Sequence, residues 1–175
     1  MKKVLLFPGA FNPPHLGHVA ILEATLKKES FDEIWIIPSG NRDDKVISTT
    51  YEDRRNLGNL FVEFLRTKIS TPIKLMTDEL DDAKGRPTQE TLEEIKSQPD
   101  IQTVQLIGSD GMANLQASSD KQLNMEDFIV AQRDSTDISS TQIRTMIQNG
   151  DSGYRNLVPQ EIADYIDING LYQTK

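Results

Sequence analysis

Five short apolar runs alternate with segments of helical periodicity, and this alternation restricts the fold more than any other feature of the chain. The apolar runs are Val4–Phe7, Ile34–Ile37, Ile73–Met76, Val104–Ile107 and Phe128–Ala131. Helices are predicted at His15–Lys28, Asp53–Thr67, Thr88–Ser97, Ser140–Asn149 and Pro159–Ile168. Compact apolar runs are typical of strands buried on both faces, and strand–helix alternation builds right-handed βαβ units. The sequence therefore predicts an α/β fold: a doubly wound parallel sheet of about five strands with helices on both faces and a small helical C-terminal part.

Length and charge narrow the class of protein. The 175 residues fit one domain, residues 1–175, with a helical segment from about residue 138 packed on it. A net charge of −8 and the absence of cysteine argue against a broad nucleic-acid-binding face, disulfides and thiolate metal sites. No apolar run approaches the ~20 residues of a membrane span, and the apolar start of the chain ends at Pro8, too early for a secretory leader. We expect a cytoplasmic protein without nucleic-acid or membrane partners, and the sequence leaves homo-oligomer formation open.

The loop after the first apolar run carries the strongest signal. It reads Gly9-Ala10-Phe11-Asn12-Pro13-Pro14-His15-Leu16-Gly17-His18 and contains both histidines of the chain. Gly9 would let the backbone approach a ligand, and the following helix would offer unpaired N–H groups to an anion. His15 and His18, three residues apart, would share one helix face. We interpret the loop as an anion site. A zinc site would need a carboxylate as third ligand, so no metal is predicted here.

A second motif, Ile138–Arg144, opens a predicted helix late in the chain. Ser139 and Gln142 form a capping-box pattern. That pattern does not account for Thr141 and Arg144, which would share a face near the helix N-terminus. A hydroxyl and a guanidinium at such a position suit phosphate oxygens.

Other signals are weaker. Gly108-Ser109-Asp110 follows the fourth apolar run and is compatible with a turn or a site. Thr88 opens a helix and is compatible with a cap or a site. The acidic runs Asp78–Asp82 and Glu93-Glu94 are interpreted as solvated surfaces.

The pattern Gly9-x-Phe11-x-Pro13-Pro14-His15-x-Gly17-His18 resembles the HxGH signature of the adenylyl- and cytidylyltransferase superfamily. That superfamily has a Rossmann-like fold and transfers a nucleotide from ATP or CTP to a phosphate or a phosphorylated substrate. The segment Ile138–Arg144 is similar to the family's ISSTxIR motif, which binds the ATP phosphates. The C-terminal stretch Val158–Tyr172 resembles that of bacterial nicotinate mononucleotide adenylyltransferases, and we expect it to serve packing.

The resemblance implies a role for each matched residue. The implied catalytic residues are His15, His18 and Arg144. The implied ATP-binding residues are Gly9, Ala10, Phe11, His15, Gly17, His18, Gly108, Asp110, Ile138, Ser139, Ser140, Thr141 and Arg144. The acceptor would contact Lys45, Thr88 and Arg133, and Mg²⁺ would arrive with ATP.

The function implied is transfer of AMP from ATP to nicotinate or nicotinamide mononucleotide, a step of NAD biosynthesis that releases pyrophosphate. The sequence departs from the family pattern at two places, both among residues that the resemblance assigns to the acceptor. Residues Leu115–Ser119 lack the family's ring-stacking Trp, and Arg42-Asp43-Asp44 stands where the family often has Pro and His. The only Trp, Trp35, is predicted to pack in the core. Three alternatives therefore stay open: adenylyl transfer to another acceptor such as phosphopantetheine, cytidylyl transfer to an alcohol phosphate, and a non-catalytic nucleotide-binding module.

Overall fold

A computed structural model describes residues 1–40, 49–81, 88–118, 122–131 and 137–173. Within this part of the chain, five parallel strands form one sheet in the order β3-β2-β1-β4-β5. The strands are β1 (Lys2–Gly9), β2 (Glu33–Pro38), β3 (Ile73–Leu75), β4 (Ile101–Gly108) and β5 (Phe128–Ala131). Each contains one of the predicted apolar runs, apart from the last residue of the third. The predicted doubly wound α/β fold is confirmed, with its switch point between β1 and β4.

All five predicted helices form, with bounds shifted by one or two residues. They are α1 (Leu16–Lys28), α2 (Tyr51–Arg66), α4 (Thr88–Lys96), α6 (Ser140–Gln148) and α7 (Gln160–Asn169). The structure adds α3 (Asp78–Asp81), α5 (Ser109–Ser118) and the 3-10 turns η1 (Met125–Asp127) and η2 (Ser152–Asn156). Helix α5 has no apolar stripe that could reveal it, since Met112 is its only buried residue. No helix in the described ranges is long and apolar enough to cross a membrane.

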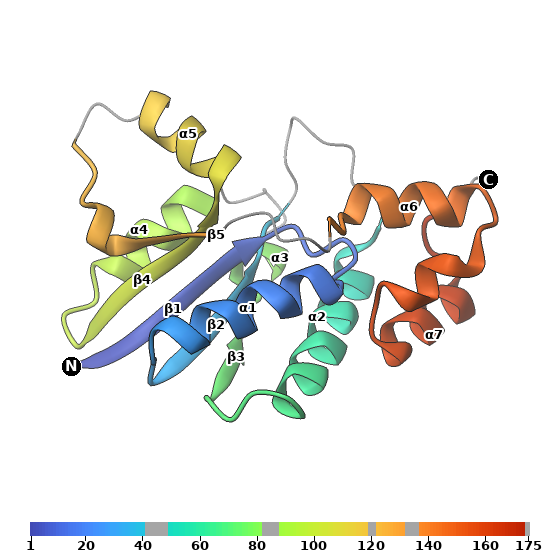
Figure 1. Ribbon diagram of the computed structural model, residues 1–175, viewed down its shortest axis with the longest axis horizontal. Coiled ribbons are helices and arrows are strands. Elements are labelled where there is room, and N and C mark those ends of the chain that lie inside the picture. The colour runs from blue at the N-terminus through green and yellow to red at the C-terminus, as the bar shows by residue number, and fades with distance from the viewer. Residues whose placement is uncertain (41–48, 82–87, 119–121, 132–136, 174–175) are drawn as a thin grey trace.

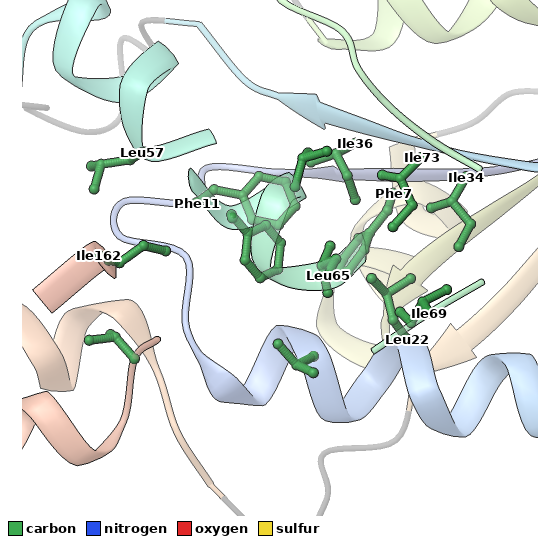
Figure 2. Close-up of a cluster of buried hydrophobic side chains, with 14 of the residues drawn as sticks. Phe7, Phe11, Leu22, Ile34, Ile36, Leu57, Leu65, Ile69, Ile73 and Ile162 are labelled. Carbon is green, nitrogen blue, oxygen red and sulfur yellow. The ribbon is translucent and has the colours of Figure 1, made fainter. Parts of the chain in front are cut away.

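Alternate residues of each central strand face opposite layers. Leu5 and Phe7 of β1 pack with α1 and α2, as do Ile34 and Ile36 of β2. Figure 2 shows Phe7, Ile34 and Ile36 of these strands near Leu65 of α2 and Leu22 of α1. The intervening strand residues pack against α4 instead, in the smaller cluster Val4, Leu6, Trp35, Ile37, Leu92 and Ile95. Trp35 therefore lies in the core, as predicted.

The C-terminal helices lie beyond the carboxyl ends of the strands. Figure 1 shows α6 and α7, in orange and red, outside the edge toward which the β1 arrow points. Ile162 of α7 packs near Leu57 of α2 and Phe11 of the loop after β1 (Figure 2). Two segments far apart in sequence thus meet at the edge where parallel sheets bind ligands.

Candidate functional site

A cavity of about 830 Å³ opens at the switch point of the sheet. It is lined by the loop after β1, the first residues after β4, the start of α6 and the residues that follow α7. The predicted site residues that line it are Ala10, Phe11, His15, His18, Gly108, Asp110, Ile138, Ser139, Ser140, Thr141 and Arg144. The structure therefore brings the two motifs to one cavity.

The two imidazoles stack on each other, and each accepts a hydrogen bond from a main-chain N–H. His15 is the N-cap of α1, and its Nδ1 accepts the N–H of Gly17 at 3.0 Å. The Nδ1 of His18 accepts the N–H of His15 at 3.1 Å, and the two ring centroids lie 3.7 Å apart. Because each Nδ1 is an acceptor, each neutral ring carries its proton on Nε2. Both histidines line the cavity, and each neutral ring has one N–H donor, at Nε2.

Aromatic rings surround His18 on the protein side. The ring centroids of Phe11, Phe7 and Phe61 lie 4.8, 5.9 and 6.0 Å from that of His18. Burial lowers the pKa of His18 well below 6.5, with a smaller contribution from His15. Both effects keep the ring neutral at pH 7, so that it donates a hydrogen bond through Nε2–H and does not act as a cationic acid.

We expect the histidine pair to make the protein less stable as the pH falls. Burial lowers the pKa of His15 from 6.5 to about 4. Between these two values the unfolded chain binds a proton that the folded chain does not, so the free energy of unfolding rises with pH. Between pH 6.5 and about pH 4, protonation linked to His15 lowers the free energy of unfolding by about 3 kcal/mol. His18 acts in the same direction.

Urea unfolding from about pH 4 to about pH 7 measures this dependence. His15→Asn is the matched variant, because asparagine can still accept the Gly17 N–H as an N-cap but does not titrate. Its free energy of unfolding is expected to vary less with pH over this range than that of the wild type. An equal slope for the two proteins would contradict the assignment.

The expected anion site at unpaired N–H groups of α1 is not present. The N–H of Leu16 donates to the Leu157 carbonyl at 2.9 Å, and that of His18 donates to the His15 carbonyl at 3.1 Å. The Gly17 N–H is taken by the His15 ring. The start of α1 is therefore already satisfied by the protein, and the donors it presents to the cavity are imidazole N–H groups.

Two predicted glycines serve ring packing and do not line the cavity. A Cβ on Gly9 would stand 3.2 Å from the Phe11 ring, and one on Gly17 would stand 2.8 Å from the His15 ring. These glycines make room for side chains of the site. Gly108 differs, since a Cβ there would meet no protein atom within 4 Å and would point into open space at the cavity.

Helix α6 is joined to the loop after β1. Arg144 donates from Nη1 to the Asn12 carbonyl at 2.7 Å and from Nη2 to Thr141 Oγ1 at 3.2 Å. Ser140 Oγ donates to the Pro13 carbonyl at 2.9 Å. The predicted capping box of Ser139 and Gln142 is also present. The arginine is thereby held with its remaining N–H donors at the cavity.

Arg54 is a buried residue that was not predicted. It lies on α2, is 2% exposed, and donates from Nη2 to the carbonyl oxygens of Ala10, at 2.9 Å, and Ser39. It thus ties the loop after β1 to the loop after β2. In the sequence it stands three residues before Leu57 and seven before Phe61, on the apolar face of the helix, so this spacing could have indicated its burial.

The interpretation of Asp78–Asp82 as a solvated surface is wrong for Glu79. This side chain is 1% exposed, and its Oε2 accepts the Gly40 N–H and the Thr88 hydroxyl, each at 2.9 Å. Burial raises the pKa of Glu79, opposed by these hydrogen bonds and by Arg54. The Thr88 hydroxyl is therefore hydrogen-bonded to Glu79, and Thr88 does not line the cavity. A contact between Thr88 and the acceptor stays a prediction.

The remaining acceptor-side predictions lie outside the described residues. These are Lys45 and Arg133, together with the departure at residues 42–44. Residues 115–118 of α5 carry no aromatic side chain. The missing Trp is therefore not replaced in that described stretch.

The cavity also has a lining that was not predicted. These residues are Asn12, Ile21, Thr49, Asp53, Ser109, Ala131, Gln148, Gly170, Leu171, Tyr172 and Gln173. Asn12 and Ser109 stand within the recognised motifs and could have been found there. Gly170–Tyr172 belongs to the stretch that was expected to serve packing alone, and the structure corrects this by placing these residues, with Gln173, on the cavity wall.

A doubly wound sheet with its cavity at the switch point is the architecture of nucleotide-binding proteins. Residues 6–146 match the family model of cytidylyltransferase-like proteins, so this chain belongs to that family and is a nucleotidyltransferase.

Its relatives are more specific in name. It is 30% identical over 196 residues to a probable nicotinate-nucleotide adenylyltransferase of Bacillus licheniformis, covering 99% of this chain and 100% of the relative. Identity is 29% with the nicotinate-nucleotide adenylyltransferase of Bacillus subtilis, with the same coverage. Among solved structures, the nicotinic acid mononucleotide adenylyltransferase of Plasmodium falciparum complexed with NaAD has a TM-score of 0.76 at 18% identity, covering 98% of each chain.

Proposed function

We propose that residues 1–175 act as one adenylyltransferase domain that transfers AMP from ATP to nicotinate mononucleotide and releases pyrophosphate. The observation that carries the proposal is the meeting of two neutral imidazoles and Arg144 at one cavity of the switch point. The names of the Bacillus relatives and the NaAD bound in the Plasmodium structure support nicotinate mononucleotide as the acceptor.

The chemistry follows from the donors at the cavity. A phosphate oxygen of the mononucleotide attacks the α-phosphorus of ATP, and the bond from that phosphorus to the bridging oxygen breaks, so that pyrophosphate leaves. The attacking phosphate is largely dianionic at pH 7, so no base has to remove a proton from it. Catalysis then consists of positioning and charge stabilisation.

Each donor of the two motifs has a place in this scheme. His18 donates its Nε2–H to an α-phosphate oxygen as charge develops there, and His15 helps to hold the phosphates. Arg144 and Thr141 stabilise the leaving pyrophosphate. Asp110, which lines the cavity after β4, contacts the ribose.

The donor set fits a magnesium ion that is carried by the triphosphate. Among the described residues, no group of three or more His, Asp or Glu side chains could hold a metal. Magnesium keeps several waters and binds readily to phosphate oxygens. When bound it would neutralise phosphate charge, while the protein contributes the imidazole, hydroxyl and guanidinium donors.

Pyrophosphate release with a panel of acceptors tests the proposal. The panel contains nicotinate mononucleotide, nicotinamide mononucleotide, phosphopantetheine and an alcohol phosphate, each with ATP and with CTP. We expect the highest kcat/KM with ATP and nicotinate mononucleotide. Turnover only with phosphopantetheine or only with CTP would assign another reaction, and ATP binding without any pyrophosphate would identify a non-catalytic nucleotide-binding module.

A further inference from the structure

The residues after α7 return to the cavity through a sharp turn. Gly170 ends the helix in the left-handed region with φ 61°, and the Leu171 N–H donates back to the Ile166 carbonyl at 3.0 Å. Tyr172 also has a positive φ, 63°, which is costly for a residue with a Cβ. It is buried and lines the cavity. The cost of the positive φ at Tyr172 has to be offset by interactions that this residue makes in the folded protein.

Its hydroxyl reaches the loop that carries the histidines. Tyr172 donates to Oδ1 of Asn12, and Thr49 donates to the same oxygen at 3.1 Å. The main-chain carbonyl of Asn12 accepts Nη1 of Arg144 at 2.7 Å. Asn12 is therefore a junction between the chain end, the loop before α2 and the phosphate-side arginine.

Two hydroxyl groups, from Tyr172 and Thr49, converge on Oδ1 of Asn12, and both donate to it. Burial raises the pKa of Tyr172, so its hydroxyl remains protonated and donates. These two hydrogen bonds hold the Asn12 side chain, and the main-chain carbonyl of the same residue accepts Arg144.

We propose that Tyr172 is a positioning residue for ATP: its hydroxyl holds Asn12, and through Asn12 it holds the histidine loop and Arg144 in register. This role rests on the proposed function, because the groups that it positions are the ATP-side donors. The chain end then acts on the triphosphate side of the site and leaves the acceptor side unaffected.

Tyr172→Phe removes the hydroxyl and keeps the ring. We expect kcat/KM for ATP to fall about tenfold, the equivalent of one buried hydrogen bond. The KM for the acceptor should change by less than about twofold, since the hydroxyl donates to Asn12, whose carbonyl holds the ATP-side Arg144. The affinity for a non-hydrolysable ATP analogue, measured by calorimetry, should fall in parallel with kcat/KM.

Tyr154→Phe is the matched control. Tyr154 is also a buried tyrosine of the C-terminal segment, but its hydroxyl donates to Asp167 and it does not line the cavity. This variant should lose stability in urea unfolding and keep the wild-type ATP parameters. If Tyr172→Phe also keeps the wild-type analogue affinity and kcat/KM for ATP, the positioning role is refuted.

A double-mutant cycle with Asn12→Ala tests the route. If Tyr172 acts through Asn12, adding Tyr172→Phe to Asn12→Ala should cost less than about twofold more in analogue affinity. Fully additive losses would overturn the proposed route. Analogue binding does not depend on turnover, so these outcomes are distinguishable from a failure of the proposed function, which would appear as wild-type protein that forms no pyrophosphate.

Discussion

His18→Ala is expected to lower kcat about 100- to 1000-fold, the usual loss for one donor to charge that develops in a transition state. The wild-type ring presents Nε2–H to the cavity because its Nδ1 accepts the His15 N–H. Alanine leaves nothing at this point to stabilise charge on the α-phosphate. The aromatic rings around the position and the rest of α1 remain, so the fold should be retained.

Steady-state pyrophosphate release gives kcat, and circular dichroism with urea unfolding reports the fold. His18→Asn is the companion variant, because its Oδ1 can still accept the His15 N–H while its amide N–H lies elsewhere than the imidazole Nε2–H. Both variants should be strongly impaired. Near-normal turnover in either one would remove His18 from the reaction.

Arg144→Ala is expected to lower kcat by about 100-fold, because the charge on the leaving pyrophosphate loses its guanidinium partner. Arg144→Lys should recover little of this loss. In the wild type, two different nitrogens are engaged by the Asn12 carbonyl and by Thr141, and the single nitrogen of lysine cannot reproduce that fork while also contacting phosphate.

Arg155→Ala supplies the control for loss of a C-terminal arginine. Arg155 lies on η2 in ion pairs with Asp164 and Asp167, and it does not line the cavity. Its kcat should match the wild type. Equal activities for the Arg144 and Arg155 variants would contradict the role given to Arg144.

Most of the fold could be predicted from the sequence. Strands that are buried on both faces of the sheet appear as compact apolar runs, and the helices between them appear as segments of helical periodicity. The convergence of His18 with Arg144 was also predictable. Each residue belongs to a motif that follows a strand, and the carboxyl ends of parallel strands lie at one edge of the sheet. The family and the fold class were confirmed, and the predicted reaction agrees with the names of the relatives.

Other parts of the site were missed. Arg54 stands at helical spacing from Leu57 and Phe61 on the buried face of α2, and this signal was not used. Glu79 accepts a main-chain N–H from a distant loop, and such a partner leaves no trace in residue spacing. The approach of Tyr172 depends on the backbone turn at Gly170, which the sequence shows only as an ordinary helix end. Helix α5 lacked an apolar stripe.

Several hydrogen bonds that hold the loops of the site are made to main-chain carbonyl groups. Arg54 holds the carbonyls of Ala10 and Ser39, Arg144 holds that of Asn12, and Ser140 holds that of Pro13. A carbonyl oxygen is present whatever side chain its residue carries, so replacement of a loop side chain leaves these anchors in place. Side chains of these loops can therefore be replaced while the loops keep their places around the cavity.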